Sequence, residues 1–143
     1  MIFVERTTAL TADVLWEVLS DLRRWPDWLP TVDAARPVDP DHTAGPGACY
    51  VIDQPGLPRA TWTVTDWRAG AGFTWESRRP GILTTGTHEL VPIDDGTTIR
   101  LGVTWSGLLA APVGWVYGSR TRDYVTREAA ALEATAAARR TEV

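Results

Sequence analysis

The chain has 143 residues, of which 44% are hydrophobic and 22% charged, and its formal net charge is -4. This length suits a single domain, predicted here as 1–143, with a sizeable core and some enclosed space. The acidic balance argues against nucleic acid as a principal partner. All 14 basic residues are arginine, so no lysine is present to form a Schiff base or hold pyridoxal phosphate.

Further classes of site are excluded by missing motifs. One cysteine, Cys49, cannot form an internal disulfide or a paired-cysteine metal site, and His42 and His88 lie far apart in the sequence. No phosphate-binding loop, dinucleotide fingerprint or nucleophile elbow is present, so we expect neither metal nor cofactor. The N-terminus lacks the apolar run of a signal peptide, and no stretch reaches membrane-spanning length. We therefore expect a cytoplasmic protein without integral membrane association.

The first elements in chain order are a strand and a broken helix. Residues 2–9 predict a strand, and an amphipathic helix over 13–22 follows, with Thr11 as its N-cap. Pro26 is expected to push Trp25 out of helical geometry, so the helix should break there and a short second helix or turn should follow. The indoles around this proline are large and apolar, and the break should therefore fold back over a core or a cavity mouth.

Six more strand candidates follow, most of them bounded by turn residues. They are 31–37, 48–53, 60–68, 73–79, 82–91 and 97–107, with a loop rich in proline and glycine at 39–47. Short connections between them favour antiparallel neighbours. From Pro112 to Arg140 the chain is predicted to be helical. The apolar stripe of this helix consists of Val125, Ala129, Leu132 and Ala136.

These elements together predict a container. An antiparallel sheet of seven strands cannot leave its apolar face in water, and the terminal helix, at about 1.5 Å per residue, is long enough to cross it. One helix against a strongly curved sheet leaves a space that side chains fill only partly. A working ligand site there should measure on the order of 300–1,000 Å³. The eight tryptophans fit either a tryptophan-rich core or an aromatic-lined pocket.

The pattern resembles the helix-grip (SRPBCC) superfamily of START-like, Bet v 1-like and polyketide cyclase/dehydrase-related proteins. The segments that carry the resemblance are Ala12-Asp13-Val14-Leu15-Trp16, Asp21 with Trp25-Pro26-Asp27-Trp28, Gly96-Thr97-Thr98-Ile99, Gly107, and the terminal helix with Leu132. The resemblance implies an α+β fold in which a curved seven-stranded antiparallel sheet wraps around a long C-terminal helix, with two short helices after the first strand. It implies lipid, hormone or polyketide ligands, and only some members are enzymes. The Met-His-Pro-Asp segment associated with aromatase/cyclases is absent.

Strand parity predicts which side chains face the cavity, starting from the alternation along 97–107. The predicted ligand-binding residues are Tyr50, Trp62, Val64, Phe73, Trp75, His88, Leu101, Val103, Trp105, Tyr117 and Tyr124. The two helix tyrosines either point their hydroxyls at the cavity or simply pack. Asp66 and Arg79 have inward parity near strand ends, which predicts rim positions. Trp115 is either a gate or membrane-touching tip, or a plain contact at the helix start.

His88 is the single candidate for a catalytic residue. It is interpreted either as a hydrogen-bonding or acid/base group for a bound ketone or phenol, or as a satisfied core histidine, since the sequence places no carboxylate to orient it. The leading hypothesis is a carrier, sensor or sequestering protein for a hydrophobic small molecule, present as a monomer or homodimer. The alternative is an enzyme of the polyketide cyclase, aromatase or dehydratase type. A third class is an interaction module with a filled core.

Overall fold

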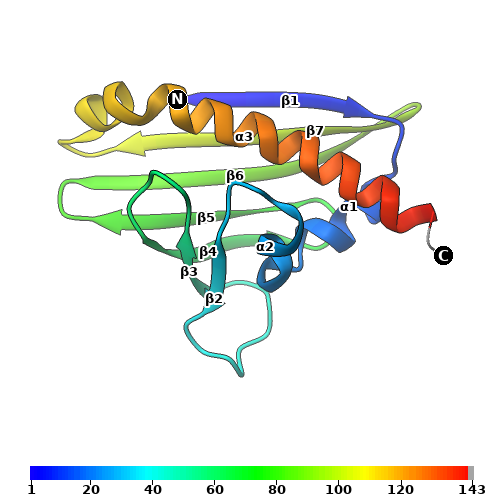
Figure 1. The fold of residues 1–143 in the computed structure, drawn as a ribbon, viewed down its shortest axis with the longest axis horizontal. Coiled ribbons are helices and arrows are strands. Elements are labelled where there is room, and N and C mark those ends of the chain that lie inside the picture. Colours follow the sequence, from blue (N-terminus) through cyan, green and yellow to red (C-terminus); the bar gives the residue numbers. More distant parts are fainter. Residues whose placement is uncertain (142–143) are drawn as a thin grey trace.

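A curved antiparallel sheet and one long helix form the two main layers of the molecule (Figure 1). The computed structural model describes residues 1–141, and within them the sheet has seven strands in the order β1-β7-β6-β5-β4-β3-β2. The strands are β1 (Ile2–Thr8), β2 (Ala34–Pro37), β3 (Cys49–Asp53), β4 (Ala60–Arg68), β5 (Gly72–Arg79), β6 (Ile82–Ile93) and β7 (Gly96–Ser106). The predicted α+β helix-grip architecture is confirmed.

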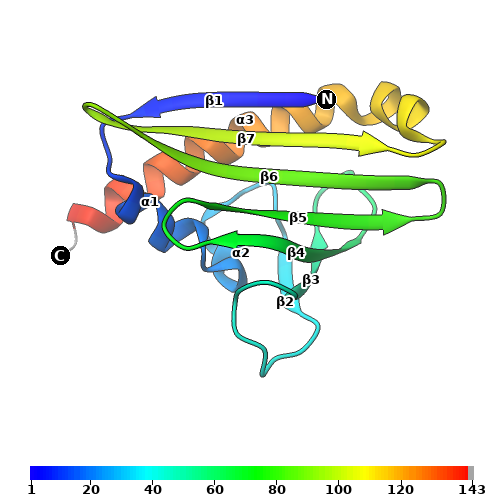
Figure 2. The same cartoon turned by 180° about the vertical axis from the view of Figure 1, so that it is seen from behind.

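The strands that come first and last along the chain, β1 and β7, lie side by side in the sheet. β1 pairs with β7 from Ile2↔Val103 to Thr8↔Thr97, whereas the other neighbouring strands are consecutive along the chain. Figure 2 shows this order from behind, on the sheet face that α3 leaves uncovered. The predicted alternation along β7 is confirmed on the inner face, where Ile99 and Leu101 are buried and Trp105 is half-buried.

The helical segment after β1 breaks earlier than predicted. α1 (Ala12–Leu19) ends at Leu19 with Ser20 as its C-cap, the chain turns at Asp21, and η1 (Leu22–Arg24) leads into α2 (Trp25–Trp28). Trp25 has helical backbone angles, φ -52° and ψ -39°, so the expectation that Pro26 would push it out of helical geometry is wrong. Pro26 instead lies in the first turn of α2, where its missing N–H costs nothing. The Trp25 indole is buried and donates a hydrogen bond to the Leu19 carbonyl over 3.0 Å.

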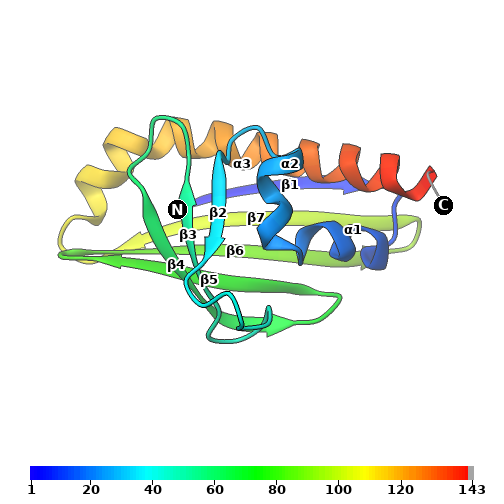
Figure 3. The same ribbon diagram turned by 60° about the horizontal axis from the view of Figure 1, so that its bottom comes forward.

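The long helix α3 (Ala110–Thr141) lies across the inner face of the sheet (Figure 3). It begins two residues before the predicted Pro112, after a tight turn at Gly107. That glycine has φ +103°, and a Cβ there would lie 2.6 Å from the carbonyl oxygen of Gly81. The turn therefore requires glycine, both for its backbone angle and for its close approach to the β5–β6 turn.

The core is concentrated under the C-terminal half of α3. Ala129, Leu132 and Ala136 of the predicted apolar stripe are at most 1% exposed, and Val125 is half-buried. α1 packs beside this half of the helix, at the end of the molecule where the β6–β7 hairpin also turns (Figure 1). Leu15 and Leu19 of α1 are fully buried there.

A β-bulge changes the predicted parity of β4. The pairing with β5 shifts between Val64 and Asp66, so every later side chain on β4 exchanges faces. Asp66 is exposed and pairs with Arg68 at 3.0 Å, so the predicted inward parity of Asp66 is wrong. Trp67 takes the inward position and packs edge-on against Trp16, with ring centroids 5.0 Å apart.

Candidate functional site

A cavity of about 320 Å³ lies between α3 and the inner face of the sheet. This volume falls at the lower end of the predicted range, so the expectation of a cavity is confirmed. Its lining includes buried residues such as Trp25, His88 and Leu101 as well as the exposed Pro58 and Arg79. The cavity is therefore closed near His88 and open where β4 begins and β5 ends.

Indole rings form much of the cavity wall. Trp62 and Trp75 stack with ring centroids 5.1 Å apart and planes 29° from parallel. Trp25 meets Trp75 edge-on at 5.3 Å, and Trp105 of β7 also lines the space. Gly86 on β6 leaves room for this arrangement, because a Cβ there would lie 2.7 Å from the Trp75 indole nitrogen. A flat aromatic ligand fits such a wall by offset or edge contacts.

His88 supplies a polar group at the closed end. The side chain projects from β6 and is buried, with its imidazole stacked on Phe73 at a centroid distance of 4.1 Å. Its Nδ1 atom lies 3.3 Å from the Phe73 carbonyl oxygen. Since a carbonyl can only accept, Nδ1 carries the ring proton, and Nε2 of the neutral ring is a hydrogen-bond acceptor.

Glu128 of α3 faces that acceptor and is not among the residues predicted from the sequence. Its Oε2 atom lies 3.6 Å from His88 Nε2, and its side chain is 12% exposed. The helical spacing contained the signal, because Glu128 falls three residues after Val125 and four before Leu132, on the inward stripe. The expectation that no carboxylate stands beside His88 is therefore wrong.

Burial keeps both members of this pair neutral near pH 7. It lowers the pKa of His88 from 6.5 to about 4, against a smaller opposing effect of the hydrogen bond to Phe73. It raises the pKa of Glu128 from 4.5 to about 8. A protonated Glu128 is a donor and His88 Nε2 an acceptor, and their 3.6 Å separation is longer than a direct hydrogen bond. A ligand hydroxyl beside both groups can accept a hydrogen bond from Glu128 and donate one to His88 Nε2.

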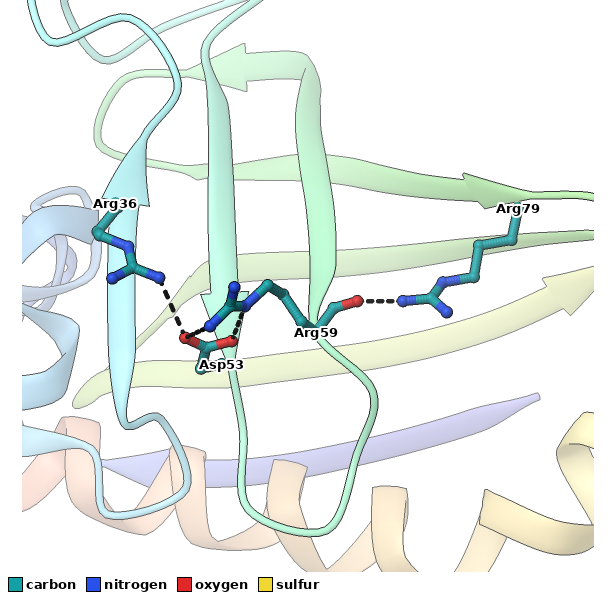
Figure 4. Close-up of polar contacts among 4 residues, drawn as sticks. All are labelled: Arg36, Asp53, Arg59 and Arg79. Carbon is teal, nitrogen blue, oxygen red and sulfur yellow. Dashed lines mark hydrogen bonds and ion pairs between the residues drawn. The ribbon is translucent and has the colours of Figure 1, made fainter.

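An arginine-rich network holds the strand ends at the open side of the cavity (Figure 4). Asp53 of β3 receives hydrogen bonds from Arg59, at 2.6 and 3.2 Å, and from Arg36 of β2 at 3.3 Å. The hydrogen bond from Arg59 is the main reason that the pKa of Asp53 lies below its usual value. Arg79 of β5 donates to the Arg59 carbonyl, which fixes its guanidinium at the rim.

The loop between β3 and β4 is tied to α3. The Tyr124 hydroxyl donates to the Pro55 carbonyl, and Arg120 donates to the Gly56 carbonyl. Leu57 and Pro58 of this loop line the cavity. The loop thus forms a side wall, and the Tyr124 hydroxyl bonds to that wall while its ring lines the space.

Eight of the eleven predicted ligand-binding residues line this cavity. They are Trp62, Trp75, His88, Leu101, Val103, Trp105, Tyr117 and Tyr124. The other three are buried outside the lining, where Phe73 supports the His88 ring and Val64 and Tyr50 fill the core. Arg79 lies at the rim as predicted. Trp115 is 88% exposed, so the interpretation as a packed contact at the helix start is wrong.

Two further findings concern ligands and membranes. Among residues 1–141, no group of three or more histidine, cysteine, aspartate or glutamate side chains is placed to hold a metal ion. No helix in the same range is both long and apolar enough to cross a bilayer.

Solved structures share this fold at low sequence identity. Norcoclaurine synthase from Thalictrum flavum, in complex with dopamine and hydroxybenzaldehyde, is 17% identical with a TM-score of 0.73, over 94% of this chain and 84% of that chain. The di-domain ARO/CYC StfQ from the steffimycin biosynthetic pathway is 12% identical with a TM-score of 0.75, over 98% and 51%. Ara h 8.0201 is 14% identical with a TM-score of 0.68, over 96% and 97%. At these identities the likeness establishes the fold alone.

Comparisons of sequence identify a family and no individual curated protein. No curated protein matches the chain. Residues 2–141 match the family described as "Polyketide cyclase / dehydrase and lipid transport". This match, together with the shared fold, confirms the resemblance to the Bet v 1-like helix-grip superfamily. The chain belongs to the polyketide cyclase/dehydrase and lipid transport family.

Proposed function

We propose that the protein binds a compact, largely aromatic small molecule whose one hydroxyl group lies beside both His88 and Glu128. The observation that carries this proposal is the indole-lined cavity of about 320 Å³ with a neutral donor and acceptor at its closed end. The family supports it, since its description includes polyketide chemistry and lipid transport. The protein would act as a carrier, sensor or sequestering protein.

The cavity's size and charge narrow the ligand class. A volume at the low end of the range for ligand sites favours two or three fused rings over a long acyl chain. The closed end offers neutral groups, so a ligand that buries an ionised group there would lose its hydration without gaining a counter-charge. An acidic group on the ligand would instead lie at the open end, beside Arg79.

The binding test uses 2-naphthol, a planar aromatic with one hydroxyl, in calorimetric titrations of the purified protein. We expect saturable binding that weakens several-fold when the hydroxyl is absent, as in naphthalene, because the donor and acceptor at the closed end then stay unpaired. Native mass spectrometry of freshly purified protein should detect a co-purified compound of similar size. The proposal would be contradicted if no planar aromatic tried binds and the native mass spectrum shows only the protein without a bound compound.

The His88–Glu128 pair favours a second candidate, an enzyme that dehydrates a β-hydroxy ketone. His88 Nε2 takes the proton from the carbon between the two oxygen-bearing carbons, and a carbon–carbon double bond forms. The carbon–oxygen bond of the β-hydroxyl breaks as Glu128 gives that oxygen its proton, and water leaves. The imidazolium and carboxylate that result lie 3.6 Å apart, so one proton transfer restores the starting state.

The enzyme test measures conversion of 4-hydroxy-4-phenylbutan-2-one to its conjugated enone by ultraviolet absorbance. If the second candidate holds, His88→Gln and Glu128→Gln should each lower turnover by about 10²–10⁴-fold, with affinity changed only a few-fold. Saturable turnover lost in both variants would favour the enzyme over the carrier. Tight 2-naphthol binding without turnover would favour the carrier.

The proposal also covers the protein's organisation. It treats residues 1–143 as one ligand-binding domain that works in the cytoplasm as a monomer or homodimer, without a cofactor. Gel filtration with light scattering, before and after 2-naphthol is added, measures the assembly state.

A further inference from the structure

An exposed apolar surface lies where β7 turns into α3. It consists of Leu108, Leu109, Trp115 and Val116, which are 93%, 45%, 88% and 61% exposed, and we call it the apolar tip. In Figure 1 the connection from β7 to α3 lies at the end of the molecule opposite the β6–β7 hairpin. Two of these apolar side chains lie in the turn before α3 and two in the second turn of α3, and exposed large apolar side chains gathered at one end of a molecule are of the kind that marks an interaction site.

The surroundings of the apolar tip are basic, although the chain as a whole is acidic. The two segments that build this end, 77–84 and 104–122, contain Arg78, Arg79, Arg120 and Arg122 and no aspartate or glutamate. The acidic residues that flank them are Glu76, which lies 3.9 Å from Arg78, and Asp123, which pairs with Arg127 at 3.1 Å, so the arginines remain in excess. Arg78 and Arg79 line one shallow groove together with Leu108, so these two arginines border the tip at Leu108. The occupant must accept both apolar insertion and positive charge.

The apolar tip also adjoins the open end of the cavity. Val113 and Tyr117 face the cavity from the same helical turns on which Trp115 and Val116 face outward. Arg79 lines both the cavity and the groove that contains Leu108. Whatever covers the apolar tip therefore lies at the entrance for a ligand.

We propose that the apolar tip docks on an anionic phospholipid bilayer. Leucines and an indole at a helix start suit the boundary between headgroups and acyl chains, and bordering arginines suit negatively charged headgroups. A second copy of the chain fits less well, because a symmetric contact would bring the two sets of arginines together. Resting on the proposed function, docking would place the cavity entrance against the layer in which an apolar ligand is dissolved.

The test is sedimentation of the full chain with phosphatidylcholine vesicles, with and without phosphatidylserine. We expect binding that requires phosphatidylserine and weakens as salt increases. Trp115→Ala should weaken vesicle binding roughly tenfold or more, because a large apolar side chain no longer inserts. Arg78→Gln should weaken it roughly fivefold and only on vesicles with phosphatidylserine. Ile93→Ser, at the opposite end of the sheet and also exposed, is the matched control and should bind as wild type.

Other outcomes would overturn the proposal. They are equal binding to neutral vesicles, no vesicle binding at all, or an equal loss in Ile93→Ser. A dimer in gel filtration that Trp115→Ala abolishes would make the apolar tip a contact between copies. Failure of membrane docking can be distinguished from failure of the proposed function by calorimetry with 2-naphthol. Trp115→Ala leaves every cavity-lining residue in place, so this variant should bind 2-naphthol as the wild type does.

Discussion

The two halves of α3 make different contacts with the same sheet. In the C-terminal half, Ala129, Leu132 and Ala136 are almost fully buried and pack against α1 and the sheet. In the N-terminal half, Val113 and Tyr117 line a cavity and their neighbours face solvent. One continuous helix thus contributes core at one end and a cavity wall at the other.

The difference shows how the fold separates stability from binding. Small alanines let the C-terminal half of α3 approach the sheet and α1 closely, and Ala129, Leu132 and Ala136 are buried there. In the N-terminal half, the larger side chains of Val113 and Tyr117 border the cavity instead. Glu128 lies where the two halves meet, at the boundary between packed core and cavity. Its carboxyl is therefore buried enough to stay protonated and yet is accessible to a ligand.

The largest expected effect is a loss of stability from a substitution in the packed C-terminal half of α3. Leu132→Ala should lower the free energy of unfolding by about 2–5 kcal/mol, because it leaves a cavity under a fully buried side chain. Val113→Ala, on the cavity half, is the matched comparison and should cost less than about 1.5 kcal/mol, since its side chain already borders empty space. Urea unfolding followed by circular dichroism measures both. Equal losses would contradict the division of α3.

The next largest effect is on ligand binding in the cavity that the N-terminal half of α3 covers. Trp75→Ala should weaken 2-naphthol binding by about 1–3 kcal/mol, because the ligand loses one face of the indole wall. Trp67→Ala is the control, since this indole lies on the inner face but outside the cavity lining. Calorimetry on both folded variants tests the assignment. Unchanged affinity in Trp75→Ala would mean that the ligand lies elsewhere.

Glu128, at the boundary, should make stability depend on pH. Between the ordinary His88 pKa of 6.5 and the raised Glu128 pKa of about 8, the unfolded chain has lost the Glu128 proton and the folded protein keeps it. Stability should therefore fall as pH rises through this window, by about 2 kcal/mol. Below pH 6.5 the lowered pKa of His88 has the opposite effect on stability, because His88 is protonated in the unfolded chain and neutral in the folded protein.

The matched variants for this prediction are Glu128→Gln and Glu17→Gln. Urea unfolding at several pH values should show that the fall above pH 6.5 disappears in Glu128→Gln and persists in Glu17→Gln, whose side chain is exposed. If the free energy of unfolding of Glu128→Gln depends on pH as in the wild type, the Glu128 carboxyl is ionised in the folded protein at neutral pH. That result would contradict a neutral His88–Glu128 pair.

The smallest expected effect lies at the outer face of the open end. Trp115→Ala should change the free energy of unfolding by less than about 0.5 kcal/mol, because the side chain is 88% exposed. Thermal unfolding measures this change. A loss comparable to that of Leu132→Ala would show that Trp115 is packed in solution. It would then contradict the assignment of Trp115 to an exposed apolar tip.

Much of the container was predictable from local patterns. Turn residues bounded most strands closely, and the alternation along β7 identified the inner face. The parity of β4 failed after Val64 because a β-bulge there inserts a residue without glycine or proline to mark it. The position of the helix break failed because Pro26 suits the first turn of a helix as well as it interrupts one.

The polar pair shows a different limit. His88 was found by parity within one strand, but its partner lies 40 residues later on another layer. Helical spacing identified Val125 and Leu132 as inward, and Glu128 shares their face. A charged residue on such a stripe is usually assigned to solvent, so only the packed structure brings the two side chains together.

The most direct test of the cavity as a ligand site is an indole N–H spectrum of ¹⁵N-labelled protein during titration with 2-naphthol. The chain has eight tryptophans, and four of them, Trp25, Trp62, Trp75 and Trp105, line the cavity. We predict that these four indole signals shift together and saturate, while those of Trp16, Trp28, Trp67 and Trp115 move little. Saturable shifts confined to the second set, or no shifts at all, would contradict the account.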